Sequence, residues 1–118
     1  MRWEVVELMG YAYFAELGYR IFVPLVRGDG YDFIAEQNGL FLRVNVKLAG
    51  LKDKSDQNSW SISQASGSIQ NSPRRDKTTC DIFLTYLPFS NRFIELPGSF
   101  LDSGNSKSKR IPKELLLS

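Results

Sequence analysis

The sequence predicts an α+β or α/β fold, in which one helix precedes a β-meander and further strands of a single mixed sheet. Three observations predict it: apolar residues at helical spacing near the N-terminus, an Asn-Gly pair between two alternating stretches, and two apolar stretches after a long polar segment. With 118 residues, the chain is long enough for one hydrophobic core. We therefore expect a single domain, residues 1–118, with a polar insert at about 49–79.

The first element is a predicted helix over residues 3–17, with Gly18 in the position just past its end. Its apolar stripe, at the spacing i, i+3, i+4 and i+7, consists of Val5, Leu8, Met9 and Ala12. A second stripe on a different face consists of Glu4, Glu7, Tyr11 and Phe14. The first stripe is typical of the buried face of an amphipathic helix.

A predicted hairpin over residues 31–48 follows a short strand at residues 19–23 and a turn at residues 28–30. Asn38 and Gly39 accept the positive φ angles of a type I′ turn, and an Asn-Gly pair between apolar stretches is the strongest short-range hairpin signal. With a two-residue loop, Gln37 pairs with Leu40. Counting outward from that pair opposes residues 32 and 45.

This pairing predicts three polar side chains on one face of the hairpin. Asp32 and Asn45 would be directly opposed, with Cβ atoms about 4.5–5.5 Å apart. Lys47 shares the face of Asn45, because side chains alternate along a strand. The other face carries an apolar layer formed by Tyr31, Phe33, Leu42, Val44 and Val46. A carboxylate, an amide and an ammonium on one side of a hairpin predict a functional site.

The remaining elements follow the polar insert, which holds Trp60 and is expected to contain a short helix or a ribbon. Strands are predicted at residues 81–86 and 92–96, and Pro97 ends the second of them. Residues 103–110 are predicted to form a basic loop. Residues 111–117 are predicted to form a terminal strand or a helical turn.

Composition excludes several kinds of site. The chain has no histidine and one cysteine, which rules out Ser-His-Asp and Cys-His triads, imidazole zinc sites and a disulfide within the chain. What remains is carboxylate, lysine and tyrosine chemistry, and hard cations such as Mg²⁺ that prefer oxygen ligands. A single cysteine suits a reducing cytoplasm. No apolar stretch approaches the roughly 20 residues that span a bilayer, so no membrane partner is expected.

The order of these motifs resembles the PD-(D/E)XK nuclease superfamily, above all the branch that holds archaeal Holliday junction resolvases and a group I intron homing endonuclease. Here Glu7 precedes Gly18-Tyr19 in the manner of that family's first helix. The segment 31–34, Tyr-Asp-Phe-Ile, resembles its aspartate strand, and the segment 44–47, Val-Asn-Val-Lys, resembles its (E/Q)-X-K strand. The resemblance covers residues 4–47 well and 80–98 loosely. It implies a restriction-endonuclease-like core and a metal-dependent DNA endonuclease.

The resemblance also implies a role for each motif residue. Asp32 would anchor a Mg²⁺ ion, for which Mn²⁺ can substitute, and Glu7 would reach in from the helix. The Asn45 side chain and the Val46 main-chain carbonyl would complete the protein ligands. Lys47 would activate the attacking water or stabilise the anion that forms at phosphorus. Asn45 stands where the family carries glutamate or glutamine, and its amide is neutral and one methylene shorter.

Simpler interpretations of the same residues stay open. Asp32 beside a turn and Lys47 on a strand are also ordinary surface residues. An Asp32–Asn45 hydrogen bond is an ordinary cross-strand contact. Glu4, one turn earlier in the helix, competes with Glu7.

Basic residues in the second half of the chain are candidates for phosphate contacts. They are Arg74, Arg75, Lys77, Lys107, Lys109 and Arg110. Within residues 55–64, the amides of Gln57, Asn58 and Gln64 are of the kind that reads adenine edges, although a polar loop has the same composition. The expected partner is double-stranded or branched DNA, cut by a homo-oligomer. Two alternatives remain: a catalytically inactive DNA-binding module on the same scaffold, and a protein-interaction domain, which the net charge of only +2 permits.

Overall fold

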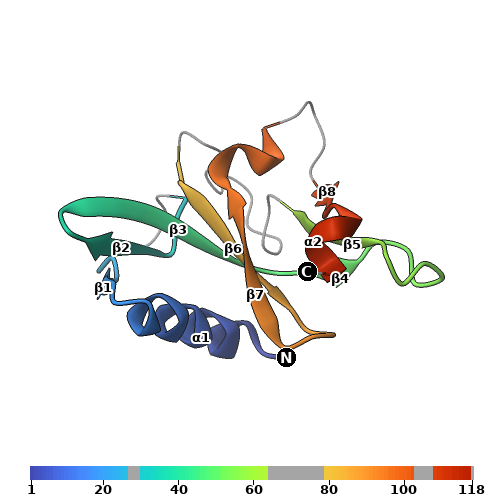
Figure 1. Ribbon diagram of the computed structural model, residues 1–118, viewed down its shortest axis with the longest axis horizontal. Coiled ribbons are helices and arrows are strands. Elements are labelled where there is room, and N and C mark those ends of the chain that lie inside the picture. Colours follow the sequence, from blue (N-terminus) through green and yellow to red (C-terminus); the bar gives the residue numbers. More distant parts are fainter. Residues whose placement is uncertain (27–29, 64–78, 103–107, 118) are drawn as a thin grey trace.

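The computed structural model describes residues 1–26, 30–63, 79–102 and 108–117, and its main body is a helix packed on a mixed sheet (Figure 1). The elements of this body are α1 (Trp3–Glu16), β1 (Arg20–Phe22), β2 (Phe33–Gln37), β3 (Leu40–Leu48), β6 (Ile82–Leu87) and β7 (Arg92–Pro97). The sheet order is β1-β2-β3-β6-β7, with β3 and β6 parallel and the other neighbours antiparallel. The predicted fold class, a helix followed by a meander and further strands, is confirmed.

A second sheet departs from the prediction of a single mixed sheet. Its strands are β4 (Gly50–Leu51), β5 (Trp60–Ser63) and β8 (Ser108–Arg110), in the order β4-β5-β8. The prediction of a loop through residue 110 is therefore wrong for β8, which pairs with β5 because the chain returns beside the insert. The 3₁₀ helix η1 (Gly98–Leu101) precedes it, and α2 (Lys113–Leu117) supplies the predicted helical turn. Among the described residues, no helix has the length and apolarity needed to cross a membrane.

Buried side chains form two clusters, and alternation along β6 separates them. Leu84 and Tyr86 belong to the cluster under α1, together with residues of β2 and β3. Phe83 and Leu87 belong to the other cluster, which includes residues of β5, β7, η1 and α2. The five-stranded sheet is thus covered on both faces, and β3 crosses the middle of the core.

The buried face of α1 differs from the predicted one. Val5 and Leu8 of the predicted stripe are 43% and 61% exposed. The buried residues of the helix are Val6, Glu7, Gly10 and Phe14. Gly10 permits close packing, since a Cβ atom there would lie 3.1 Å from Val46 Cγ2. Because apolar residues occur on more than one face of this helix, their spacing alone could not select the face that the sheet covers.

An ion pair joins β3 to the residue that precedes β6. The Arg43 main-chain N–H donates to Asp81 Oδ2 at 2.8 Å, and the guanidinium donates to both carboxylate oxygens at 3.2 and 3.1 Å. The Asp81 N–H returns a bond to the Arg43 carbonyl at 2.8 Å. These bonds hold the pKa of Asp81 below its usual value, the guanidinium bond being the main cause. The pair sits beside the parallel register that aligns Asn45 with Phe83.

Asp81→Asn is expected to lower the free energy of unfolding at neutral pH by about 1 kcal/mol, because the pair is bidentate but partly exposed. The folded pKa of Asp81 lies below the unfolded value of about 3.9, so this contribution is present above that value and is lost as the pH falls through the folded pKa. Urea unfolding of both proteins, in steps from neutral pH to about pH 3, measures it. A difference that stays constant over this range would exclude the Asp81 charge as its source.

Candidate functional site

The hairpin that carries the predicted site forms as expected. Asn38 and Gly39 have φ angles of 54° and 82°, which both positions of a type I′ turn require. Gln37 pairs with Leu40, and the register continues to Phe33 opposite Val44. The regular pairing ends there, one pair before residues 32 and 45.

Asp32 makes a different contact with β3 from the one predicted. Its N–H donates to the Val44 carbonyl at 2.8 Å, and its Oδ2 accepts the Val46 N–H at 2.6 Å. The carboxylate thus occupies the position in which a strand carbonyl would continue the ladder. This short, charge-assisted bond fixes Asp32 beside the residue that separates Asn45 from Lys47.

Tyr31 lies on the opposite side from the predicted one. It was expected to share the apolar layer of Phe33 and Val44, and it packs instead against the cluster that contains Phe83. The other residues of that layer, Phe33, Leu42, Val44 and Val46, do pack in the cluster under α1. The prediction fails at residue 31 because the chain has left the strand there, so strand alternation no longer sets the direction of its side chain.

Asn45 and Lys47 are buried on the face of β3 that meets Phe83. Their exposed fractions are 2% and 5%. The Asn45 Nδ2 donates to the Gly30 carbonyl at 3.3 Å, whereas the Asn45 Oδ1 has no hydrogen-bond partner among the residues described. The Lys47 Nζ lies 6.0 Å from the centre of the Phe83 ring. A buried amide oxygen without a hydrogen bond costs free energy, which a bound water or cation can offset.

Gly30 contributes to the site in a way that the sequence did not reveal. Its φ angle is +86°, and a Cβ atom at this position would lie 2.7 Å from Thr79 Cβ, so no other residue fits without a rearrangement. Its carbonyl binds the Asn45 amide nitrogen, which leaves the amide oxygen on the other side of the group. The turn signal at residues 28–30 did not indicate this contact, and the predicted turn itself includes residues 28 and 29, which lie outside the described ranges.

Glu7, rather than Glu4, lies on the buried face of α1. Glu7 is 5% exposed, and its Oε1 accepts a hydrogen bond from the Tyr11 hydroxyl at 2.7 Å. Glu4 has an exposed side chain that pairs with Arg2 at 3.5 Å. Both glutamates, with Leu8 and Tyr11, line a cavity of about 190 Å³. Of the two glutamates, Glu7 is therefore the buried one.

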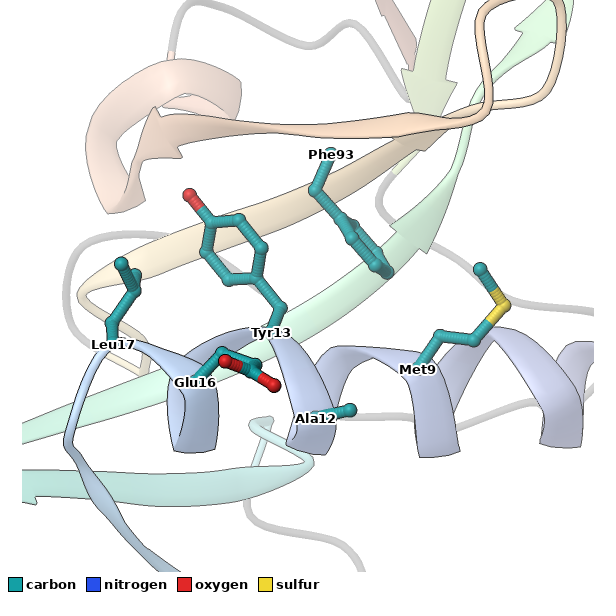
Figure 2. A pocket seen from close by; sticks show the side chains of 6 residues that line it. All are labelled: Met9, Ala12, Tyr13, Glu16, Leu17 and Phe93. Carbon is teal, nitrogen blue, oxygen red and sulfur yellow. The ribbon is translucent and has the colours of Figure 1, made fainter.

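Another groove runs between α1 and β7 (Figure 2). Its volume is about 440 Å³, and it is lined by Met9, Ala12, Tyr13, Glu16, Leu17 and Phe93. Burial and the Glu95 carboxylate, which accepts the Tyr13 hydroxyl at 2.6 Å, raise the pKa of Tyr13 to about 12. None of the predicted catalytic residues lines this groove. Tyr13 lines it, whereas Tyr11 and Glu7 line the smaller cavity, so the Tyr13–Glu95 and Tyr11–Glu7 hydrogen bonds lie at different places on the protein.

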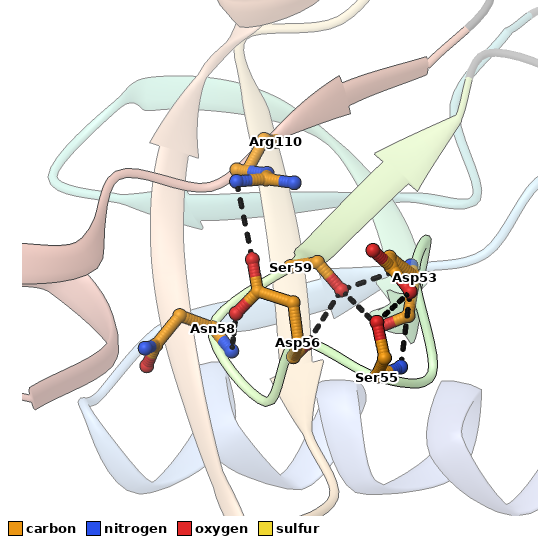
Figure 3. A network of polar contacts seen from close by, with 6 residues as sticks. All are labelled: Asp53, Ser55, Asp56, Asn58, Ser59 and Arg110. Atoms are coloured by element: carbon orange, nitrogen blue, oxygen red, sulfur yellow. Dashed lines mark hydrogen bonds and ion pairs between the residues drawn. The ribbon is translucent and has the colours of Figure 1, made fainter.

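Two of the predicted DNA-binding residues lie on β8, and each interacts with another side chain of the protein. The Lys109 Nζ lies 4.7 Å from the centre of the Phe100 ring. Arg110 points toward Asp56 in the β4–β5 loop, with 3.5 Å between the charged atoms (Figure 3). The Asp56 Oδ1 also accepts the Asn58 N–H at 2.9 Å. Arg74, Arg75, Lys77 and Lys107 lie outside the described residues, as does Gln64.

The oxygen atoms that could hold a metal ion come from few charged groups. Within the described ranges, no three histidine, cysteine, aspartate or glutamate side chains gather in one place. The candidate donors on the hairpin are the Asp32 carboxylate, the Asn45 amide oxygen and the Val46 carbonyl. Glu7 lies on α1 and lines a cavity that none of these three residues lines. These donors are all oxygen atoms, which hard cations such as Mg²⁺ prefer as ligands, but together they carry little negative charge.

Comparisons with known proteins support the fold. No family model matches the sequence, and no curated protein matches it by sequence. Among solved structures, the chain is similar to the bacterial homing endonuclease I-Ssp6803I, with a TM-score of 0.68 and 16% sequence identity over 92% of this chain and 70% of that chain. At this level of identity the likeness shows a shared fold, which is therefore one that a nuclease uses.

Proposed function

We propose that the chain is a metal-dependent DNA endonuclease of the PD-(D/E)XK type, which hydrolyses phosphodiester bonds with Mg²⁺, or with Mn²⁺ in its place. One observation carries the proposal: the Asn45 Oδ1 is buried without a hydrogen-bond partner among the described residues, next to Val46, whose N–H binds Asp32. The fold shared with a homing endonuclease supports the same class of reaction.

The residues present fit a hard divalent cation. Asp32 supplies an anionic oxygen that the Val46 N–H holds in place, and Asn45 supplies a neutral oxygen that lacks a donor among the described residues. Glu7 and the Val46 carbonyl would complete the protein ligands. When bound, Mg²⁺ would stabilise the negative charge that develops on the scissile phosphate.

The proposed role of Lys47 follows from its burial. Hydrolysis forms a bond from a water oxygen to phosphorus and breaks the bond to the leaving oxygen, so negative charge grows on the phosphate oxygens. Lys47 would hold a proton at Nζ and direct its positive charge to these oxygens. Because the ammonium is buried against Phe83, bulk water screens it less than it would screen a surface lysine.

A plasmid nicking assay tests the proposal. Supercoiled DNA incubated with the full chain and Mg²⁺ or Mn²⁺ should convert to nicked and linear forms, and EDTA should prevent the conversion. Intact plasmid with both metals, over a range of DNA sequences that includes branched junctions, would reject the enzymatic function.

A catalytically inactive DNA-binding module is the second candidate, and the neutral side chain of Asn45 favours it. With fewer anionic ligands, the site would bind Mg²⁺ weakly. Gel-shift titrations at several salt concentrations separate the candidates: a module without activity should still bind DNA, with an affinity that falls as salt rises. Absence of binding at low salt would reject both and leave the protein-interaction domain.

Asn45→Glu is expected to tighten Mg²⁺ binding about tenfold, which corresponds to about 1.4 kcal/mol, because it adds a carboxylate and a methylene at the proposed ligand position. Titration calorimetry with Mg²⁺ measures the change. Asn58→Glu, the same substitution in the exposed β4–β5 loop, is the matched control and should leave the affinity unchanged. Equal affinities of Asn45→Glu and the wild type would remove residue 45 from the coordination sphere.

We also propose that two or more copies act together on DNA. Each chain would contribute a single set of catalytic residues, so cutting both strands of a duplex calls for a second copy. Exposed apolar side chains on β1 and on the hairpin support self-association: Phe22, Leu40 and Phe41 are 42%, 64% and 61% exposed. Lys109 and Arg110 on β8, with the basic residues outside the described ranges, are proposed to contact phosphates.

A further inference from the structure

Tyr11 contacts both the Glu7 carboxylate and Phe33, the first residue of β2, which follows Asp32. Its hydroxyl donates to Glu7 Oε1 at 2.7 Å, across one turn of α1. Its ring packs edge-on against Phe33, with ring centres 5.0 Å apart and planes at 89°. Phe33 is fully buried and directly follows Asp32 in the chain. One side chain therefore touches both the Glu7 carboxylate and the start of β2.

The physical consequence is a restriction on the Glu7 side chain. A glutamate has several rotatable bonds, and the carboxylate of a residue that is only 5% exposed needs hydrogen bonds to offset its loss of hydration. The Tyr11 hydroxyl supplies such a bond from a ring that the edge-on contact with Phe33 immobilises. The orientation of the Glu7 carboxylate therefore depends on the packing of Tyr11 against β2 as well as on α1 itself.

We propose that Tyr11 is a positioning residue that holds the Glu7 carboxylate in the orientation in which it binds a divalent cation; this inference rests on the proposed function. Residues that hold a metal ligand by a hydrogen bond commonly change metal affinity by about 10- to 100-fold when they are lost. Tyr11 touches neither the cation nor the DNA in this role, so its removal weakens metal binding without removing a ligand.

Tyr11→Phe tests the inference, because it deletes the hydroxyl and keeps the ring on Phe33. Mn²⁺ titrated into the full chain by calorimetry should bind about tenfold more weakly to Tyr11→Phe than to the wild type. The matched control is Tyr13→Phe, which deletes the other hydroxyl of α1 that binds a carboxylate, that of Glu95, in the separate groove. Tyr13→Phe should bind Mn²⁺ as the wild type does, and both variants should unfold thermally as single transitions.

A double-mutant cycle separates positioning from other effects. In a Glu7→Gln background, Tyr11→Phe should cause no further loss of Mn²⁺ affinity, because the carboxylate that it positions is gone. A loss of affinity that came only from altered packing of the helix would persist in the Glu7→Gln background.

Two results would overturn the inference while the proposed function stands: Mn²⁺ binding by Tyr11→Phe equal to that of the wild type, or an equal loss of affinity with and without the Glu7 carboxylate. A wild-type chain that binds no Mn²⁺ would reject the proposed metal site, and the inference about Tyr11 would fail with it. The wild-type titration therefore distinguishes the two failures.

Discussion

Asp32→Asn is expected to slow plasmid nicking at least about 10³-fold while the fold is retained. Asparagine keeps a carbonyl oxygen for the Val46 N–H, which the carboxylate now accepts at 2.6 Å, so the start of β2 should stay in place. What it removes is the negative charge, and with it the proposed anionic ligand of the cation. Single-turnover nicking rates in Mg²⁺ and in Mn²⁺, together with thermal unfolding, measure the two effects separately.

The matched control for this change is Asp102→Asn, at the residue that follows η1. It removes the same charge from the chain and should leave the nicking rate within about twofold of the wild type, as expected of a change away from the reacting groups. If Asp32→Asn nicks as fast as the control, Asp32 holds the end of the hairpin and has no part in the chemistry. A loss of folding in Asp32→Asn would instead show that the Val46 bond needs a charged acceptor.

Lys47→Met is expected to lower the nicking rate by about 10²- to 10³-fold, the usual effect of losing one group that stabilises transition-state charge. Methionine is unbranched and apolar, so it should fill the buried position beside Phe83 and keep the protein folded. Affinity for DNA at low salt should change little, because one buried charge contributes little to phosphate neutralisation. The measurements are single-turnover nicking with saturating protein, and gel shift.

Lys113→Met, on the exposed side of α2, provides the control for a lost ammonium. Its nicking rate should equal that of the wild type. Equal rates for Lys47→Met and Lys113→Met would leave Lys47 as a buried lysine whose stem packs on Phe83, and would remove the proposed source of charge stabilisation. Weaker DNA binding in Lys47→Met alone would reassign it to substrate binding.

Local signals predicted the hairpin correctly because its geometry depends on adjacent residues. Asn38 and Gly39 tolerate positive φ angles, and this fixed the turn type, the loop length and the register as far as Phe33 and Val44. From that register, alternation placed Asn45 and Lys47 on one face of β3, where both are buried. The same rule stopped working where the strand ended, so Tyr31 faces away from the predicted side and Asp32 binds main chain.

The helix shows why periodicity has limits. Two stripes of α1 had the spacing of a buried face. The more apolar stripe, with Val5 and Leu8, is largely exposed in the structure. The sheet covers the stripe with Glu7 and Phe14 because Gly10 lets the helix approach Val46. Gly10 permits that approach, but the strand that it meets comes later in the chain, so the spacing of apolar residues within 3–17 does not select this face.

By itself, the sequence determined the order of α1 and the strands of the five-stranded sheet, the turn at residues 38–39 and the candidate residues Asp32, Asn45 and Lys47, because these follow from short-range backbone preferences and from the motif. Tertiary structure alone decided three other features: the burial of the Glu7 carboxylate, the lack of a partner for the Asn45 oxygen among the described residues, and the pairing of β8 with the insert. Each depends on contacts between segments that are far apart in the chain. The free energy of such contacts cannot be inferred from a local sequence pattern.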